Sequence, residues 1–254
     1  MKASVIIQAR MGARRLPGKV LFKAGGKTVL EHVIGRVQRA RRIHRVVVAT
    51  TVAKEDLPIV RLAARHGIGV FCGSPEDVLD RYYQAARLFG FEHVVRITAD
   101  CPLIDPAVID RVVGAYFKGK ADYAANSIQP TYPDGQDVEV FSFKALEQAW
   151  QKTRVASQRE HVTVFIRRNP KFFKLISVRQ AQDLSHWRWT LDEPSDWVLI
   201  RNILKYFHRR KPDFTMEDVL RVFKAHPGWG KVNQHIRRNE GYQHSVSRDR
   251  KVRS

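Results

Sequence analysis

Residues 93–119 read HVVRITADCPLIDPAVIDRVVGAYFKG. A short β-branched run, HVVRITAD, is followed by DPAVIDRVVGAYFKG, in which apolar residues recur with the period of a helix. The first run is nearly continuous in apolar residues, which is typical of a strand that is buried on both faces of a sheet. The stretch therefore predicts one strand and one helix of a parallel sheet.

The same alternation occurs three times before this stretch. SVIIQA leads into TVLEHVIGRVQRA, RVVVATT leads into EDLPIVRLAARHG, and IGVFC leads into SPEDVLDRYYQAARLFG. Four consecutive strand-helix units with apolar strands predict an α/β fold, in which helices cover both faces of a parallel sheet. Ligands bind such sheets at the carboxyl ends of the strands.

After about Lys120 the pattern becomes mixed. DVEVFSF, FFKLISVRQ and HWRWTL resemble strands, while KALEQAWQKTR and QREHVTVFIRRN resemble helices. We therefore expect a mixed insertion or small lobe added to the sheet, followed by closing helices in PSDWVLIRNILKYFHRR and TMEDVLRVFKAH. Residues 236–254 lose apolar periodicity, so we expect a single domain over residues 1–235 and a basic, mobile tail after it.

The composition is that of a folded protein without a membrane segment. Of the 254 residues, 44% are hydrophobic, which is enough for a sizeable core. Two isolated cysteines, Cys72 and Cys101, indicate a reducing compartment rather than a disulfide framework. The N-terminus lacks the apolar run of a signal peptide, and no later run has the length of a membrane span. We therefore expect a cytoplasmic protein that is not inserted in a membrane.

Positive charge is the strongest bias in the composition. The chain has 45 Lys and Arg against 25 Asp and Glu, a formal net charge of +20, which attracts nucleic acids, anionic membranes or small polyanions. After the strand SVIIQ come four cations interspersed with glycines: Arg10, Arg14, Arg15 and Lys19. Because glycines let backbone N–H groups approach an anion closely, this loop predicts a phosphate site at the ligand edge of the sheet.

Two carboxylates follow apolar runs farther along the chain. Asp100 follows VVRITA and Asp192 follows RWTL, each at the end of a predicted strand. Mg²⁺ is held by one or two carboxylates together with phosphate oxygens and water, so the pair predicts a metal site if the fold brings both strand ends together. Taken singly, each aspartate is equally consistent with a turn or a helix start.

Six ordered motifs resemble a known family. They are IIQARMGARRLPGKVL, FCGSPEDVLDRY, ITADCPLIDP, YPDGQDVEVFSF, SQREHVT and RWTLDEPSDW. Together they resemble the CMP-sugar synthetase type of cytidylyltransferase, which includes acylneuraminate and ketodeoxyoctonate cytidylyltransferases. The motifs are most similar to the branch named after spore coat polysaccharide biosynthesis protein SpsF. The resemblance covers about residues 3–240.

The resemblance implies a Rossmann-like, three-layer α/β/α nucleotidyltransferase fold of the nucleotide-diphospho-sugar transferase type and an enzyme of class EC 2.7.7. The implied reaction transfers CMP from CTP to a hydroxyl of an acidic or modified sugar, releases pyrophosphate, and uses Mg²⁺ or alternatively Mn²⁺. The implied role is the activation of a sugar for surface polysaccharide or glycan synthesis. A homodimer is also implied, and about residues 126–190 are the implied region for acceptor binding and dimerisation.

The resemblance also implies roles for individual residues. The implied catalytic residues are Arg10, Arg15, Lys19, Asp100 and Asp192, of which Asp100 and Asp192 hold the metal. The implied nucleotide-binding residues are Gln8, Ala9, Arg10, Gly12, Lys19, Ser74, Arg81, Thr98, Ala99 and Asp100. The implied acceptor-binding residues are Asp137, Glu139, Arg159, Glu160 and His161. Where relatives commonly carry small hydroxyl residues, between Gly12 and Arg15, this chain has Ala13 and Arg14.

Two alternative function classes stay open on the sequence. A nucleic-acid-binding protein would use the net charge of +20 and stack bases on Trp187, Trp189 or Trp229, although the chain contains no recognised nucleic-acid module. A nucleotide-sugar-dependent glycosyltransferase would need a metal-binding DxD motif, and the DCP that follows ITA lacks the second carboxylate. His161 beside Glu160 is equally consistent with deprotonation of an acceptor hydroxyl and with an ordinary helix-surface histidine.

Overall fold

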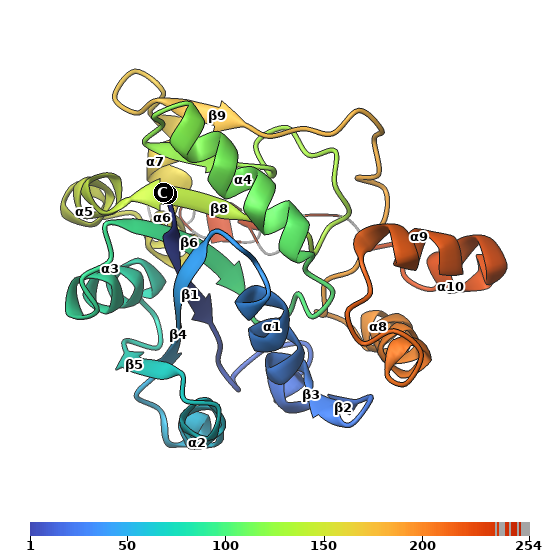
Figure 1. Cartoon of the computed structure of the whole chain (residues 1–254). Helices are drawn as coiled ribbons and strands as arrows, with labels where there is room; N and C mark the ends of the chain where they lie inside the picture. The colour runs from blue at the N-terminus through green and yellow to red at the C-terminus, as the bar shows by residue number, and fades with distance from the viewer. Residues whose placement is uncertain (237, 239–241, 244, 248, 250–254) are drawn as a thin grey trace.

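A mixed sheet forms the centre of the molecule, and helices lie on both of its faces (Figure 1). The structure is a computed structural model that describes residues 1–236, 238, 242–243, 245–247 and 249. Within these residues the sheet has seven strands in the order β5-β4-β1-β6-β8-β7-β9. This arrangement confirms the expected three-layer α/β/α fold.

The parallel half of the sheet contains the four strands that the sequence predicted. They are β1 (Ala3–Gln8), β4 (Ile43–Thr51), β5 (Gly69–Gly73) and β6 (His93–Thr98). β1 pairs with β4 on one side and β6 on the other, and β4 pairs with β5, all in parallel. The helices that follow these strands are α1 (Val29–Gln38), α2 (Leu57–Arg65), α3 (Val78–Leu88) and α4 (Pro106–Lys118). The predicted strand-helix units are thus confirmed.

The mixed region extends the same sheet. β8 (Glu139–Ser142) pairs antiparallel with both β6 and β7 (Tyr123–Ala125), and β9 (Leu175–Ser177) pairs parallel with β7. The helices between β8 and β9 are α5 (Phe143–Lys152), α6 (Ala156–Glu160) and α7 (Val164–Arg168). The expected insertion is therefore part of the central sheet.

The remaining elements are two predicted helices and several short pieces. α8 (Pro194–Phe207) and α9 (Met216–Ala225) are the expected closing helices. The unpredicted elements are η1 (Lys19–Leu21), the hairpin of β2 (Lys23–Ala24) and β3 (Lys27–Thr28), η2 (Lys54–Asp56), the short strand β7 (Tyr123–Ala125) and α10 (Pro227–Lys231). Pieces of two to five residues are too short to show a hydrophobic period, so sequence patterns do not identify them. Among the described residues, none of the helices is long and apolar enough to cross a bilayer.

The prediction of a strand in HWRWTL, residues 186–191, is wrong. This segment lies outside the sheet and has only an isolated bridge between Arg188 and Asp134. Its backbone pairs with a loop instead, because Asp134 N donates to Trp187 O at 2.9 Å and Trp189 N donates to Asp134 O at 2.7 Å. Trp189 is completely buried and contacts the α9 helix, so the alternating pattern reflects burial beside the closing helices.

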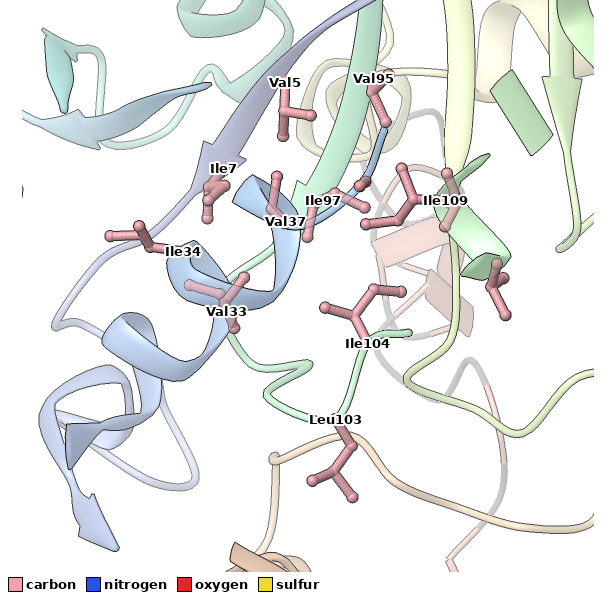
Figure 2. Packing of buried hydrophobic residues seen from close by; sticks show 14 of the residues in the cluster. Val5, Ile7, Val33, Ile34, Val37, Val95, Ile97, Leu103, Ile104 and Ile109 are labelled. Carbon is pink, nitrogen blue, oxygen red and sulfur yellow. The ribbon is translucent and has the colours of Figure 1, made fainter. Parts of the chain in front are cut away.

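The buried residues of the sheet divide between its two faces. In β1, Val5 and Ile7 belong to the cluster that includes residues of α1 and α4, whereas Ile6 belongs to the cluster that includes residues of α3 and α5. Successive strand residues point to opposite faces, which explains why the run is apolar at every position. Figure 2 shows the first cluster, to which Val33 and Val37 of α1 and Val5 and Ile7 of β1 belong. This packing fixes the strand ends from which the site is built.

Candidate active site

A cavity of about 540 Å³ lies at the carboxyl ends of β1 and β6, where the topology predicts a ligand site. The predicted site residues that line it are Gln8, Ala9, Arg10, Arg15, Lys19, Arg81, Thr98, Ala99, Asp100, Glu160, His161 and Asp192. Arg14 of the predicted phosphate loop also lines the cavity, and the lining residues without a predicted role are Ala13, Val20, Val78, Arg96 and Ser245. The fold therefore gathers most of the predicted residues around one space.

The cationic loop between β1 and η1 is anchored by backbone hydrogen bonds. Met11 N donates to Asp56 Oδ1 at 2.6 Å, and Gly18 N donates to Met11 O at 2.9 Å. Asp56 is itself buried and accepts a 2.5 Å hydrogen bond from Thr51 Oγ1. Gly18 has a φ of 72°, a left-handed conformation that favours glycine, and η1 begins directly after it at Lys19. The turn at Gly18 therefore places Lys19 at the cavity.

Lys19 joins the two predicted metal carboxylates. Its Nζ donates to Asp100 Oδ2 at 2.8 Å, to Asp192 Oδ1 at 2.7 Å and to the Leu191 carbonyl oxygen at 2.6 Å. An ammonium group has three donors, and all of them are used here. The structure thus brings Asp100 and Asp192 together around one positive charge.

Ion pairing in this cluster outweighs the cost of burial. Burial opposes the charged form of Lys19, but the carboxylates of Asp100 and Asp192 raise the pKa of the ammonium above its usual value. Burial likewise opposes ionisation of Asp100, yet Lys19 lowers the pKa of that carboxyl to about 2. Lys19 and Asp100 are therefore both charged at neutral pH.

Arg188 holds Asp192 from the side opposite Lys19. Arg188 Nη2 donates to Asp192 Oδ2 at 3.1 Å, and Nη1 donates to Asp134 Oδ2 at 3.0 Å. Nε and Nη2 also form a bidentate ion pair with Asp196, in which Nε lies 3.0 Å from Oδ1 and Nη2 lies 3.0 Å from Oδ2. Arg188 is only 7% exposed, so its ion pairs with the three carboxylates are largely shielded from water. The network binds Oδ2 of Asp192, while Oδ1 contacts Lys19 at the cavity.

A glycine permits the docking of the segment that carries Arg188 and Asp192. Gly135 has a φ of 97°, and a Cβ at this position would lie 2.6 Å from the backbone of Trp189. Any larger residue would clash with that backbone and would also be strained at this φ. The glycine of YPDGQD thus allows the Asp134 loop to pair with the Trp189 backbone.

Arg81 is a buried guanidinium at the cavity wall. It is 2% exposed, and its Nε has no hydrogen-bond partner among the described residues. Burial lowers the pKa of Arg81 from its usual value. A buried donor without a partner costs about 1–3 kcal/mol, so a ligand that supplies an acceptor would recover this energy. Arg81 is therefore suited to contact a ligand with a hydrogen-bond acceptor at the cavity.

The comparison with known proteins identifies the family. The cytidylyltransferase family model matches residues 4–218. The chain belongs to the cytidylyltransferase family. This cytidylyltransferase is therefore a nucleotidyltransferase enzyme, which confirms the resemblance of the six motifs.

Individual relatives resemble this cytidylyltransferase over nearly its whole length. An uncharacterised protein of Methanocaldococcus jannaschii is 36% identical, over 93% of this chain and 96% of that protein. Spore coat polysaccharide biosynthesis protein SpsF of Bacillus subtilis is 28% identical, over 87% of this chain and 94% of SpsF. The solved structure of a cytidylyltransferase from Leptospira borgpetersenii has a TM-score of 0.86 and 33% identity, and covers 94% of this chain and 100% of that one.

Glu139 of the cytidylyltransferase lies beneath the cavity in a buried network. It forms an ion pair with Arg96, which lines the cavity, and accepts hydrogen bonds from Tyr123 Oη at 2.5 Å and Thr163 Oγ1 at 2.6 Å. Arg96 Nε also donates to Gln8 Oε1 at 3.2 Å. Glu139 therefore acts on the cavity through Arg96. A cation inside the apolar run VVRIT is the sequence signal that points to Arg96.

Four other predicted residues are not among the described residues that line the cavity: Gly12, Ser74, Asp137 and Arg159. Ser74 Oγ accepts a 3.0 Å hydrogen bond from Asp77 N and shapes the turn before α3. Arg159 Nε donates to the carboxylate of the same Asp77 at 2.5 Å. Asp137 forms an ion pair with Arg238. Contacts of these four residues with a substrate stay predictions.

Asp100 and Asp192 are suited to hold a metal ion in this cytidylyltransferase. The described residues contain no group of three or more His, Cys, Asp or Glu side chains that would hold a metal alone. Two carboxylates are nevertheless sufficient for Mg²⁺ when phosphate oxygens and water complete its shell. The contact of both carboxylates with Lys19 Nζ shows that a positive charge is stabilised between them.

Proposed function

We propose that this enzyme transfers CMP from CTP to a hydroxyl of an acidic or modified sugar, releases pyrophosphate, and so activates the sugar for surface polysaccharide or glycan synthesis. The observation that carries the proposal is one cavity in which a cationic loop faces two carboxylates joined by Lys19. The likeness to SpsF supports the polysaccharide role. The expected homodimer and cytoplasmic location stay predictions.

The side chains around the cavity match the needs of nucleotidyl transfer. The acceptor oxygen attacks the α-phosphorus of CTP, and the bond to the β-phosphate bridging oxygen breaks to release pyrophosphate. Arg10, Arg14 and Arg15 would neutralise the triphosphate, because their loop lines the cavity at the end of β1. Mg²⁺, when bound, would neutralise charge on the phosphate oxygens, with Asp100 and Asp192 as its ligands.

Two further polar residues that line the cavity suit an acceptor hydroxyl. Glu160 and His161 both line the cavity, and burial lowers the pKa of His161 from its usual value. A neutral imidazole can accept a proton from a hydroxyl, whereas an imidazolium cannot. We therefore assign Glu160 and His161 to the acceptor and Arg81 to the nucleotide.

Pyrophosphate release tests the proposed reaction. We expect release from CTP and Mg²⁺ in the presence of one member of a panel of sugar acids that contains 3-deoxy-manno-octulosonate, N-acetylneuraminate and glucuronate. UTP, ATP and GTP should give much less product at the same concentration. Thermal unfolding in the presence of each nucleotide provides a second measurement, because a bound ligand stabilises the folded state. Stabilisation by ATP without stabilisation by CTP would contradict the proposal.

Arg81→Met should separate the effects of Arg81 on stability and on nucleotide binding. Because Met fills the same space without a buried charge and without the unpartnered Nε, the free energy of unfolding should stay unchanged or rise. The dissociation constant for CTP should increase about tenfold or more, because a hydrogen bond to a charged group contributes about 1.5–3 kcal/mol. Arg87→Met on the exposed side of α3 is the matched control for titration calorimetry. Equal CTP affinity in the two variants would exclude a contact between Arg81 and the nucleotide.

A further inference from the structure

Residues near the C-terminus contact Glu160 and His161 at the cavity. Ser245 lines the cavity, is 5% exposed, and lies outside residues 4–218 that match the family model. Its Oγ donates to Glu160 Oε2 at 2.7 Å and lies 3.0 Å from His161 Nε2. One hydroxyl thus contacts both of the polar residues that the proposed function assigns to the acceptor.

Three further contacts place the same part of the chain against the domain. The Tyr242 ring meets the His161 ring edge to face, with centroids 5.1 Å apart. Asp249 Oδ1 accepts a 3.1 Å hydrogen bond from Ser157 N on α6. Arg238 forms an ion pair with Asp137. These contacts involve described residues of the predicted basic tail, and the expected mobility of the tail stays a prediction.

We infer that Ser245 and Tyr242 form the wall of the acceptor site and that Ser245 is a specificity-determining residue. This inference rests on the proposed function. Ser245 has a single proton, which its bond to Glu160 uses, so its lone pairs are directed to other donors such as the Nε2–H of His161. The Ser245 hydroxyl therefore sets the distance between the Glu160 and His161 side chains. The hydroxyl group of the sugar acceptor has to fit that arrangement.

The position of Ser245 explains why its effect should be confined to the acceptor. Arg10 and Arg81, which the proposed function assigns to the nucleotide, come from the β1 loop and α3, whereas Ser245 contacts Glu160 and His161. Since the segment with Ser245 lies outside the matched part of the family, members of the family can share the same CTP chemistry and differ in this wall. The C-terminal segment would then select the sugar.

Ser245→Ala in the full chain, one shortened chain and one control test the inference. Ser245→Ala removes the hydroxyl, and a chain that ends at Ile236 removes the whole wall. Gln243→Ala is the control, because Gln243 is exposed on the same segment. The measurements are the CTP dissociation constant by calorimetry, the KM for the sugar acid that the wild-type enzyme uses, and the rate at which diethyl pyrocarbonate acylates His161, followed by peptide mass spectrometry.

We expect unchanged CTP affinity in all variants. Ser245→Ala should raise the KM for the sugar acid about tenfold, because one hydrogen-bonded contact is lost. His161 should be acylated faster in Ser245→Ala and in the shortened chain, whereas Gln243→Ala should behave as the wild type. An unchanged acylation rate, an unchanged KM or a faster turnover of the shortened chain would overturn the inference. A wild-type enzyme that binds no CTP would instead contradict the proposed function, and the acylation rate would still decide whether the wall exists.

Discussion

Asp100→Asn and Asp192→Asn should each lose turnover by about a hundredfold or more while the protein stays folded. Asparagine keeps the size of aspartate, and its carbonyl oxygen can still accept a hydrogen bond from Lys19. The substitution removes the negative charge that a divalent cation requires. Turnover measured against Mg²⁺ and Mn²⁺ concentration should show a raised metal requirement for both variants, and circular dichroism should show an intact fold.

The loss of turnover in the double variant shows whether the two carboxylates act through one shared metal ion or independently. Because both carboxylates would act through one ion, the loss in Asp100→Asn/Asp192→Asn should be far smaller than the product of the two single losses. Asp183→Asn is the control for the loss of a negative charge, since Asp183 is exposed and does not line the cavity. Wild-type activity after complete chelation, or normal metal dependence in Asp192→Asn, would remove Asp192 from the metal site.

Arg188→Met should lower the free energy of unfolding by about 3–5 kcal/mol, the cost of leaving buried carboxylates without their cation. Arg188 contacts Asp134, Asp192 and Asp196, and Asp196 is completely buried. Methionine has a similar volume but no donor, so the loss is electrostatic rather than a cavity effect. Denaturant unfolding followed by tryptophan fluorescence measures the change.

Arg221→Met is the control for the Arg188 substitution. Arg221 pairs with Asp218 on α9, but its side chain is 69% exposed, and exposed ion pairs contribute about 0–1 kcal/mol. If both substitutions cost the same, the buried network around Arg188 does not stabilise the fold. A stable Arg188→Met protein with normal metal dependence would also show that Asp192 keeps its position without Arg188.

The sequence predicted the elements whose signal is local. β1, β4, β5 and β6 and the helices after them follow from hydrophobic period, because a strand buried on both faces is apolar at every position and a helix on a sheet is apolar on one side. The same patterns did not predict the HWRWTL segment correctly. Its tryptophans alternate as in a strand, but Trp189 is buried by α9 and its backbone pairs with the Asp134 loop.

The candidate site was predicted where residues follow directly from strand ends. Arg10, Lys19 and Asp100 follow β1 and β6, so their position at the ligand edge follows from the topology. Arg188 and Ser245 were not predicted, because their importance depends on contacts with residues distant in sequence. The burial of Arg81 was likewise not visible, although the family resemblance placed it near the nucleotide.

The sequence by itself determined the α/β class, the order of the parallel units, the family and the cationic loop, since each depends on residues that are neighbours along the chain or on ordered motifs. Only the tertiary structure decided that Lys19 joins Asp100 to Asp192, that Arg188 supports Asp192, and that Ser245 reaches Glu160 and His161. Buried charges are stable only when opposite charges meet them, and which charges meet depends on how the packed sheet and its closing segments bring distant parts of the chain together.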